Sequence, residues 1–278
     1  MPWKNDTMPS PNSAAGAIPR VSAVDRRVLP VYAAGAIDVP FVIAHYQENV
    51  QMDTRWEEHS HPTHELLWNE SGVSQVTVKS RTWVITPAVG LWLPAGMLHS
   101  GTAVAGTRCN FSHFGINAVR SISAVPVAVE VTALLRLLLE RLADSTLGST
   151  SRRIAEDAVL DLLTPTPHEV FLHLPQSRLL APIVTAVQQN PGLQRSGTDW
   201  AQELGVSART ITRAFQAETG GGFAQWVARV RAQRAITLLA RGDDLEDIVK
   251  ALGYGSSSAF GAAFKRTTGF TPSTFRGK

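Results

Sequence analysis

Four side chains in the first half of the chain could together hold a metal ion. His59, His61 and Glu65 lie close together in the sequence, and His99 follows in a later segment. Successive side chains point to opposite faces of a β-strand, so the first three would share one face of a regular strand. Neutral imidazoles and a carboxylate suit Zn, Fe, Co, Ni or Mn. Residues of these types could therefore do metal chemistry if the fold brings them together.

Strands are the elements expected to position this site. Between residues 39 and 114 the chain contains short runs rich in Val, Ile, Trp and Phe, separated by Gly, Pro, Asn and Ser. Such closely spaced runs are typical of an antiparallel barrel or jelly roll. The expected strands are 41–46, 65–68, 74–78, 82–85, 91–93 and 109–114.

The spacing of the candidate ligands resembles the two motifs of the cupin family. The first motif, His-x-His-x-x-x-Glu, is complete and is followed by Gly72, and the second keeps Pro94, Gly96 and His99. The resemblance implies a jelly roll in which the same four side chains surround one divalent metal. The chain departs from the family at Ala103, where an Asn is usual, but that position is not a ligand.

Two other uses of this domain stay open. It could be a metal-dependent cupin enzyme, in which open positions on the metal bind a substrate. The second half of the chain argues against an enzyme, and we expect no catalytic residue. The effector could instead be a small organic molecule, bound by the histidines and by a pocket of aromatic side chains, Trp68, Trp83 and Trp92. Three further histidines are expected to be structural: His45, His64 and His113.

The second half of the chain contains the same local pattern twice. In each copy a short apolar segment ends at a glycine, a serine follows that can cap a helix, and a second apolar helical pattern begins. This order is typical of a helix-turn-helix unit. The first copy runs from Leu204-Gly205-Val206-Ser207 to Phe215, and the second from Leu252-Gly253-Tyr254-Gly255-Ser256 to Phe264.

Residues 200–276 resemble the DNA-binding domain of the AraC family of transcriptional regulators. The resemblance rests on both helix-turn-helix units, on the segment 223–240 between them, which lacks Pro and Gly, and on the closing Gly269-Phe270-Thr271-Pro272 and Phe275-Arg276. It implies a module that places two recognition helices in successive major grooves of double-stranded promoter DNA. It also implies that the cupin-type domain is the sensor of a regulator.

The two recognition helices are expected to contribute differently. The first presents arginines and a glutamine that can bond guanine and adenine edges, so it should set the sequence preference. The second has few donors and should mainly contact the DNA backbone, with Ala262 against a thymine methyl. The expected contacts are Ser207, Arg209, Thr210, Thr212, Arg213 and Gln216 in the first unit and Ser256, Ser257, Ser258, Ala262 and Lys265 in the second.

The chain divides into four predicted segments. They are a disordered leader at 1–27, a cupin-like sensor of a metal or effector at 28–120, a helical connector at 121–192 and the DNA-binding domain at 193–278. Within the connector, residues 131–142 place leucines on more than one side of a helix. Such a helix needs more than one apolar surface to pack against, so we expect the connector to mediate a homodimer. A helix buried wholly within one subunit and a dimer formed through the barrel stay open.

Composition and charge fit a regulator that works in the cytoplasm. At 278 residues, 44% hydrophobic and 18% charged, the chain is long enough for two globular domains. Residues 199–278 carry 11 Lys/Arg against 7 Asp/Glu, as contact with phosphates requires. Cys109 is the only cysteine, so we expect no internal disulfide, and we also expect no secretion signal or membrane span. The predicted fold class is α+β, an antiparallel jelly-roll barrel followed by an all-α domain with two helix-turn-helix motifs.

Overall fold

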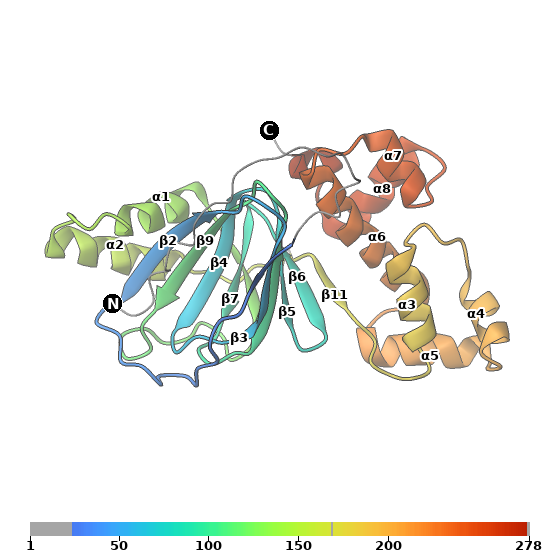
Figure 1. Cartoon of the computed structure of the whole chain (residues 1–278), viewed down its shortest axis with the longest axis horizontal. Coiled ribbons are helices and arrows are strands. Elements are labelled where there is room, and N and C mark those ends of the chain that lie inside the picture. The colour runs from blue at the N-terminus through green and yellow to red at the C-terminus, as the bar shows by residue number, and fades with distance from the viewer. Residues whose placement is uncertain (1–23, 168, 277–278) are drawn as a thin grey trace, which may run out of the picture.

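The computed structural model describes residues 24–167 and 169–276. A pair of β-sheets flanked by two helices lies on one side of the molecule, and a group of helices lies on the other (Figure 1). This arrangement confirms the expected α+β fold class, with an antiparallel sheet domain followed by an all-α domain. Within the described residues, none of the helices is both long and apolar enough to cross a membrane.

The N-terminal part consists of two sheets in which neighbouring strands run antiparallel, except that β1 and β3 are parallel. The six-stranded sheet has the order β1 (Asp25–Arg27), β3 (Thr54–His59), β8 (His99–Ala103), β5 (Ser74–Val78), β6 (Arg81–Ile85) and β11 (Phe171–His173). The five-stranded sheet has the order β10 (Val127–Glu130), β7 (Val89–Leu93), β4 (His64–Ser71), β9 (Arg108–Phe114) and β2 (Ile43–Asn49).

Apolar side chains from both sheets meet in a common interior. Leu67 and Leu91 of the five-stranded sheet pack in one buried cluster with Val76, Trp83 and Ile85 of the six-stranded sheet. The alternation of these residues with outward-facing neighbours is the pattern expected of a barrel or sandwich. Burial of such side chains stabilises the fold by roughly 2 kcal/mol each.

Two helices cover the outer face of the five-stranded sheet, on the side away from the helical domain (Figure 1). They are α1 (Ala133–Leu142) and α2 (Ser149–Leu162), which follow the predicted helical segments of the connector. Leu135, Leu139 and Val159 are fully buried against this sheet. The outward side of α1 leaves Leu134 and Leu137 more than half exposed.

The C-terminal part holds two helix-turn-helix units joined by one long helix. The first unit is α4 (Gly197–Glu203) and α5 (Ala208–Thr219), and the second is α7 (Leu245–Ala251) and α8 (Ser257–Thr268). Helix α6 (Phe223–Ala240) connects them, α3 (Ala181–Gln189) precedes them, and a short 3-10 helix, Pro272–Phe275, closes the chain. Ser207 and Ser256 cap α5 and α8 as predicted, because each side chain accepts a bond from the backbone N–H three residues later.

The boundaries between the predicted segments differ in two places. Residues 1–23 of the expected leader lie outside the described residues, but Asp25–Arg27 form β1 and pair with β3. The connector is also not purely helical, since β10 pairs with β7 and β11 pairs with β6. The stretch Phe171–His173 therefore joins the six-stranded sheet. A strand cannot be told from a linker when it is this short, because its pairing partner lies far away in the sequence.

The two parts meet where α6 packs on the outer face of the six-stranded sheet. Val73 and Val84 of the sheet domain belong to one buried cluster with Ala232 and Ile236 of α6. The indole N–H of Trp226 also donates to a backbone oxygen of β11 at 2.8 Å. Helix α6 therefore contacts the sheet domain as well as both helix-turn-helix units.

Candidate functional site

The candidate metal ligands come from both sheets. His59 ends β3 and pairs with His99 at the start of β8 in the six-stranded sheet, whereas Glu65 lies on β4 of the other sheet. His61 lies in the turn between β3 and β4. The expectation that one regular strand aligns the first three ligands is therefore wrong. They converge because the chain crosses from one sheet to the other at residues 60–63.

The ligand atoms lie close enough to share one ion. One ring nitrogen from each of His59, His61 and His99 lies within 4.8 Å of the other two. The Glu65 Oε2 atom is 3.6 Å from Nε2 of both His61 and His99. Bonds of about 2.1 Å to a tetrahedral ion separate two ligands by roughly 3.4 Å, so the two Glu65 distances need little adjustment, and the imidazole nitrogens must approach one another by about 1.4 Å at most. Glu65 Oε2 is buried and has no hydrogen-bond partner among the described residues, as expected of an atom placed to bind a cation.

Backbone carbonyls orient two of the three imidazoles. His59 Nδ1 lies 2.7 Å from the Glu57 carbonyl oxygen, and His99 Nδ1 lies 2.9 Å from the Met97 carbonyl oxygen. A carbonyl only accepts, so in both rings Nδ1 carries the proton and donates it. The lone pair is then on Nε2, the atom that can bind a metal.

Burial sets the charge of the cluster. Removal from water lowers the pKa of both His61 and His99 to about 4, so these rings are neutral near pH 7, as metal ligands must be. Burial raises the pKa of Glu65 to about 7, and the neighbouring His99 partly opposes this rise. A bound cation would favour the ionised carboxylate and would offset the cost of burying it.

His113, which was expected to be structural, lies beside the same cluster. Its strand, β9, pairs with β4 so that His113 is opposite Glu65, and its Nε2 is 3.9 Å from Glu65 Oε1. The Thr63 hydroxyl lies 3.0 Å from His113 Nδ1, and the Tyr46 hydroxyl lies 3.4 Å from Nε2. The ring centroids of His113 and His61 are 4.9 Å apart. No spacing in the sequence indicates this contact, because it depends on the register between two strands.

The three candidate pocket tryptophans do not surround one cavity. Trp68 and Trp92 are fully buried in the core beneath α1 and α2, on the outer face of the five-stranded sheet. Trp83 instead lies in the interior between the sheets. Trp68 faces outward because side chains alternate along a strand and its neighbour Leu67 faces inward. His64 also points outward, as expected, and accepts a bond from the Ala95 N–H at 2.9 Å.

The predicted DNA contacts of the first recognition helix all lie on exposed positions of α5 or its cap. Ile211 and Phe215 are fully buried on the opposite side of the helix. Among the described residues, the Arg209 and Arg213 side chains form no hydrogen bond or ion pair, so they can reach a partner outside the chain. The exposed positions are Ser207, Arg209, Thr210, Thr212, Arg213 and Gln216.

The second recognition helix presents a smaller and less polar surface. Phe260 and Phe264 anchor α8 in the core, each with only 1% of its surface exposed. The Ser256 hydroxyl already accepts the Ala259 N–H at 3.2 Å. The exposed predicted positions are Ser256, Ser257, Ser258, Ala262 and Lys265, of which only the last is charged.

Comparisons with known proteins match both parts of the chain to domain families. Residues 41–163 match an AraC-like ligand-binding domain, and residues 200–278 match a helix-turn-helix domain. The chain is similar to the HTH-type transcriptional regulator NimR of Escherichia coli, with 27% identity over 78% of this chain and 81% of that protein. It is also similar to the HTH-type transcriptional regulator RipA of Corynebacterium glutamicum, with 37% identity over 40% of this chain and 32% of the relative.

Among solved structures, the chain is similar to a lysine-to-alanine variant of apo ToxT of Vibrio cholerae. The match has a TM-score of 0.35 and 11% identity, and it covers 86% of this chain and 98% of ToxT. The two domain matches and the named regulators agree with the expectation of a transcriptional regulator and not an enzyme. They also agree with the expectation that the chain binds DNA and responds to an effector.

Proposed function

The chain belongs to the AraC family of transcriptional regulators, with an N-terminal sensor domain, and from this premise we propose that its effector is a divalent transition metal. The ligands are four side chains of the sensor, His59, His61, Glu65 and His99. The observation that carries the proposal is the buried Glu65 Oε2, which has no hydrogen-bond partner within residues 24–167 and 169–276 and lies 3.6 Å from two imidazole nitrogens. A buried carboxylate oxygen without a partner is costly unless a cation is bound there.

The ligand types limit which ions fit. Three imidazoles and one carboxylate suit Zn, Ni, Co, Fe or Mn, whereas Mg and Ca prefer oxygen ligands. The ion supplies a link between β3 and β8 of one sheet and β4 of the other. It can change DNA binding only if it stabilises one arrangement of the sensor more than another.

The strand that carries His59 also reaches the DNA-binding part. Asp53, directly before β3, forms an ion pair with Arg241 at the end of α6. A shift of β3 can therefore be transmitted through this ion pair to α6, the helix that separates the two recognition helices. This contact supports coupling between metal binding in the sensor and DNA binding.

We propose that α5 sets the sequence preference and that α8 mainly contacts phosphates. The two exposed arginines of α5 have no partners within the described chain, and arginine can bond a guanine edge at two points. In α8, the exposed serines and Lys265 suit contacts to the DNA backbone. The DNA-binding segment is 193–278, and the protein acts in the cytoplasm, where a bacterial-type regulator meets promoter DNA.

A homodimer is the proposed functional unit, formed through the connector at 121–192. Leu134 and Leu137 of α1 are 57% and 63% exposed, and Ile154 of α2 is 63% exposed. Three large aliphatic side chains on one helical pair favour a partner surface, because their burial would be stabilising. Helices α1 and α2 of the connector lie away from the DNA-binding part, so a dimer formed through them leaves α5 and α8 accessible (Figure 1).

Bound metal per chain tests the effector directly. Untagged full-length protein, loaded with Zn, Ni, Co, Fe or Mn in turn and then desalted, is analysed by elemental mass spectrometry. We expect about one ion per chain for at least one metal, and almost none in the His59→Ala/His61→Ala double variant, because removing two of four ligands abolishes tight binding. His173→Ala, which changes a half-buried histidine outside the cluster, is the matched control and should keep the metal.

DNA binding by the metal-loaded and metal-free protein completes the test. A shift in affinity for the promoter DNA next to the protein's own gene, absent in the double variant, would support a metal effector. Failure of every ion to bind the parent protein would contradict it. The effector of the regulator would then be a small organic molecule bound by the sensor domain. That alternative has weaker support in the barrel, because the three tryptophans proposed for it do not share a cavity.

A further inference from the structure

A second candidate site lies outside the barrel, between the sheet domain and the DNA-binding part. It is a cavity of about 210 Å³ bounded by strands β3, β5, β6, β8 and β11 on one side and by helices α3 and α6 on the other. Arg55, Gln75 and Ser100 line it from the sheet. Gln188 of α3 and Gln233 of α6 line it from the helices.

Strand register explains why this face is polar. Arg55, Thr102 and Gln75 are opposite one another on β3, β8 and β5, and Ser100, Thr77 and Thr82 form a second cross-strand row. The residues that alternate with them, including Val76 and Trp83, face the barrel interior. The part of the outer face that borders the cavity therefore presents mainly hydroxyl, amide and guanidinium groups, whereas Val84 on the same face packs against α6.

The lining combines many neutral hydrogen-bonding groups with one positive charge. Hydroxyls and primary amides both donate and accept, so they match a ligand with several neighbouring hydroxyl groups. Among the described residues that line the cavity there is no Asp or Glu, and Arg55 is the only charged one. Arg55 contacts Glu57 through Nε at 3.3 Å, but both side chains are solvent-accessible, and an exposed ion pair contributes little. A ligand carboxylate can therefore compete for the guanidinium.

We propose that this cavity binds a small polyhydroxylated carboxylate, of the sugar-acid class. The carboxylate pairs with Arg55, and the hydroxyls bond the threonines, Ser100 and the glutamines. The volume corresponds to about seven waters, which suits a ligand of a few carbon atoms and excludes a long apolar chain. Leu172 and Leu174 supply the apolar contact that the C–H side of such a ligand needs.

The ligand would bind the docked arrangement of the two parts. Gln75 of β5 donates to the Thr237 hydroxyl at 3.3 Å and accepts from Gln233 at 3.4 Å, so side chains from both parts already bond beside the cavity. A ligand held by Arg55 on one part and Gln188 on the other is lost when the parts separate. It therefore favours the docked arrangement by the difference between its binding free energies for the docked and the separated parts.

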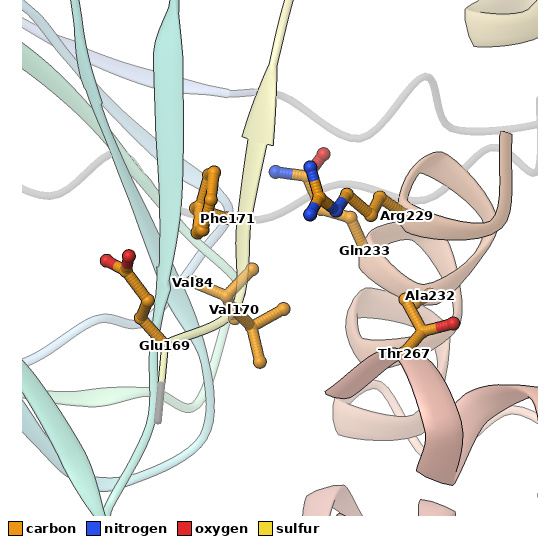
Figure 2. A pocket seen from close by; sticks show the side chains of 8 residues that line it. All are labelled: Val84, Glu169, Val170, Phe171, Arg229, Ala232, Gln233 and Thr267. Atoms are coloured by element: carbon orange, nitrogen blue, oxygen red, sulfur yellow. The ribbon is translucent and has the colours of Figure 1, made fainter. Parts of the chain in front are cut away.

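A neighbouring smaller cavity shows how closely the two parts pack here. Figure 2 shows Arg229 and Gln233 of α6 facing Phe171 and Val170 of the sheet domain. The Arg229 guanidinium is 5.1 Å from the Phe171 ring, and this cavity has a volume of about 60 Å³. It has room for about two waters, so the ligand belongs in the larger cavity.

Titration calorimetry on the full-length protein tests the site with D-gluconate and D-glucuronate. Sorbitol, which has the hydroxyls without the carboxylate, and hexanoate, which has the carboxylate without the hydroxyls, are the ligand controls. Gluconate can chelate metals, so the titration is repeated on the His59→Ala/His61→Ala variant. We expect saturable one-site binding of at least one sugar acid in both backgrounds and at least about tenfold weaker binding of both controls.

Two matched pairs of variants locate the binding. Arg55→Gln should weaken binding about tenfold or more, whereas Arg26→Gln, which pairs with the same Glu57 at 3.5 Å but is outside the cavity, should not. Gln188→Ala should weaken binding severalfold, whereas Gln189→Ala, its exposed neighbour, should leave it unchanged. Absence of binding by both sugar acids at millimolar concentration, or equal binding by Arg55→Gln and the parent, would overturn the proposal.

Discussion

His113 and Glu65 face each other across two strands, and their burial makes the stability of the sensor depend on pH. Burial lowers the pKa of His113 to about 3, with smaller contributions from the neighbouring histidines. It also lowers the pKa of His61 and His99 to about 4, against 6.5 for a free histidine. Glu65 acts in the opposite direction, because its pKa rises to about 7. The lowered pKa values of three histidines therefore affect the pH dependence of stability more than the raised pKa of one glutamate.

Acid should therefore destabilise the metal-free protein. As the pH falls below 6.5, the unfolded chain takes up protons on these histidines before the folded chain does, so the free energy of unfolding decreases down to about pH 4. The proton that folded Glu65 binds below pH 7 opposes this loss only in part. Urea unfolding in EDTA at a series of pH values measures the slope. His113→Gln should reduce that slope by about one proton between pH 6 and pH 4, and an unchanged slope would contradict the prediction.

Single residues also decide how DNA is read. Arg213→Ala should lower the preference for one guanine in the operator by roughly 1 to 3 kcal/mol, because a contact made at two points to that base is lost. Ser258→Ala on α8 should change affinity slightly and leave the preference unchanged. Selection of bound sequences from a random DNA pool, followed by competition binding, measures both effects. If the two variants relax the preference equally, α5 and α8 do not divide the work as proposed.

At the scale of elements, both helix-turn-helix units depend on a left-handed glycine between their helices. Gly205 has φ of +65° and Gly253 has φ of +72°, and other residues adopt such angles at a cost of about 1 to 2 kcal/mol. Their surroundings differ. A Cβ at Gly205 would meet nothing within 4 Å, whereas one at Gly253 would lie 2.5 Å from the Gly192 backbone oxygen. The second turn therefore also requires a close approach of two backbone segments.

Alanine substitutions at Gly205 and Gly253 should separate the free-energy cost of the left-handed backbone angle from the cost of the close backbone approach. Gly205→Ala should destabilise the DNA-binding part by about 1 to 2 kcal/mol through its backbone angle alone. Gly253→Ala should cost about 1 to 3 kcal/mol more, since the backbone near Gly192 must shift to admit the methyl group. Thermal unfolding followed by far-UV circular dichroism orders the two variants. Equal melting temperatures would mean that the contact at Gly253 relaxes without cost.

At the scale of the whole molecule, α1 and α2 are separated from the DNA-binding part by the sheets (Figure 1). The barrel thus has a different neighbour on each side, the connector helices on the five-stranded sheet and α6 on the six-stranded sheet. A shift of the barrel strands can therefore be transmitted to the connector helices and to α6. This layout allows one effector to influence both the proposed dimer surface and the position of α6.

Charges on the outer side of α1 should dissociate the proposed dimer. Leu134→Glu combined with Leu137→Glu places two carboxylates on the exposed apolar surface and should convert a dimer into monomers with an unchanged circular dichroism spectrum. Val28→Glu is the control, because Val28 is 82% exposed but lies outside the connector, directly after β1. Light scattering coupled to size-exclusion chromatography measures the mass. A monomeric parent protein, or a variant that stays dimeric, would rule out this surface.

Much of the DNA-binding part could be predicted from the sequence. The capping serines, the left-handed glycines and the buried pairs such as Ile211 and Phe215 are local signals, which act within a few residues of one another. The same holds for the strands and for the four candidate ligands, whose spacing matches a known motif. Local patterns of this kind need no knowledge of which distant segments pair.

The remaining features depend on distant pairing, and only the tertiary structure decided them. Strand register brings His113 to Glu65, and the pairing of β3 with β8 brings His99 to His59. Strand alternation relative to the barrel places Trp68 under the helices instead of in a pocket. The cavity beside Arg55 exists only because two domains meet there. The amino-acid sequence determines all of these contacts, but each is the result of packing between segments far apart in the chain, for which a local pattern carries no signal.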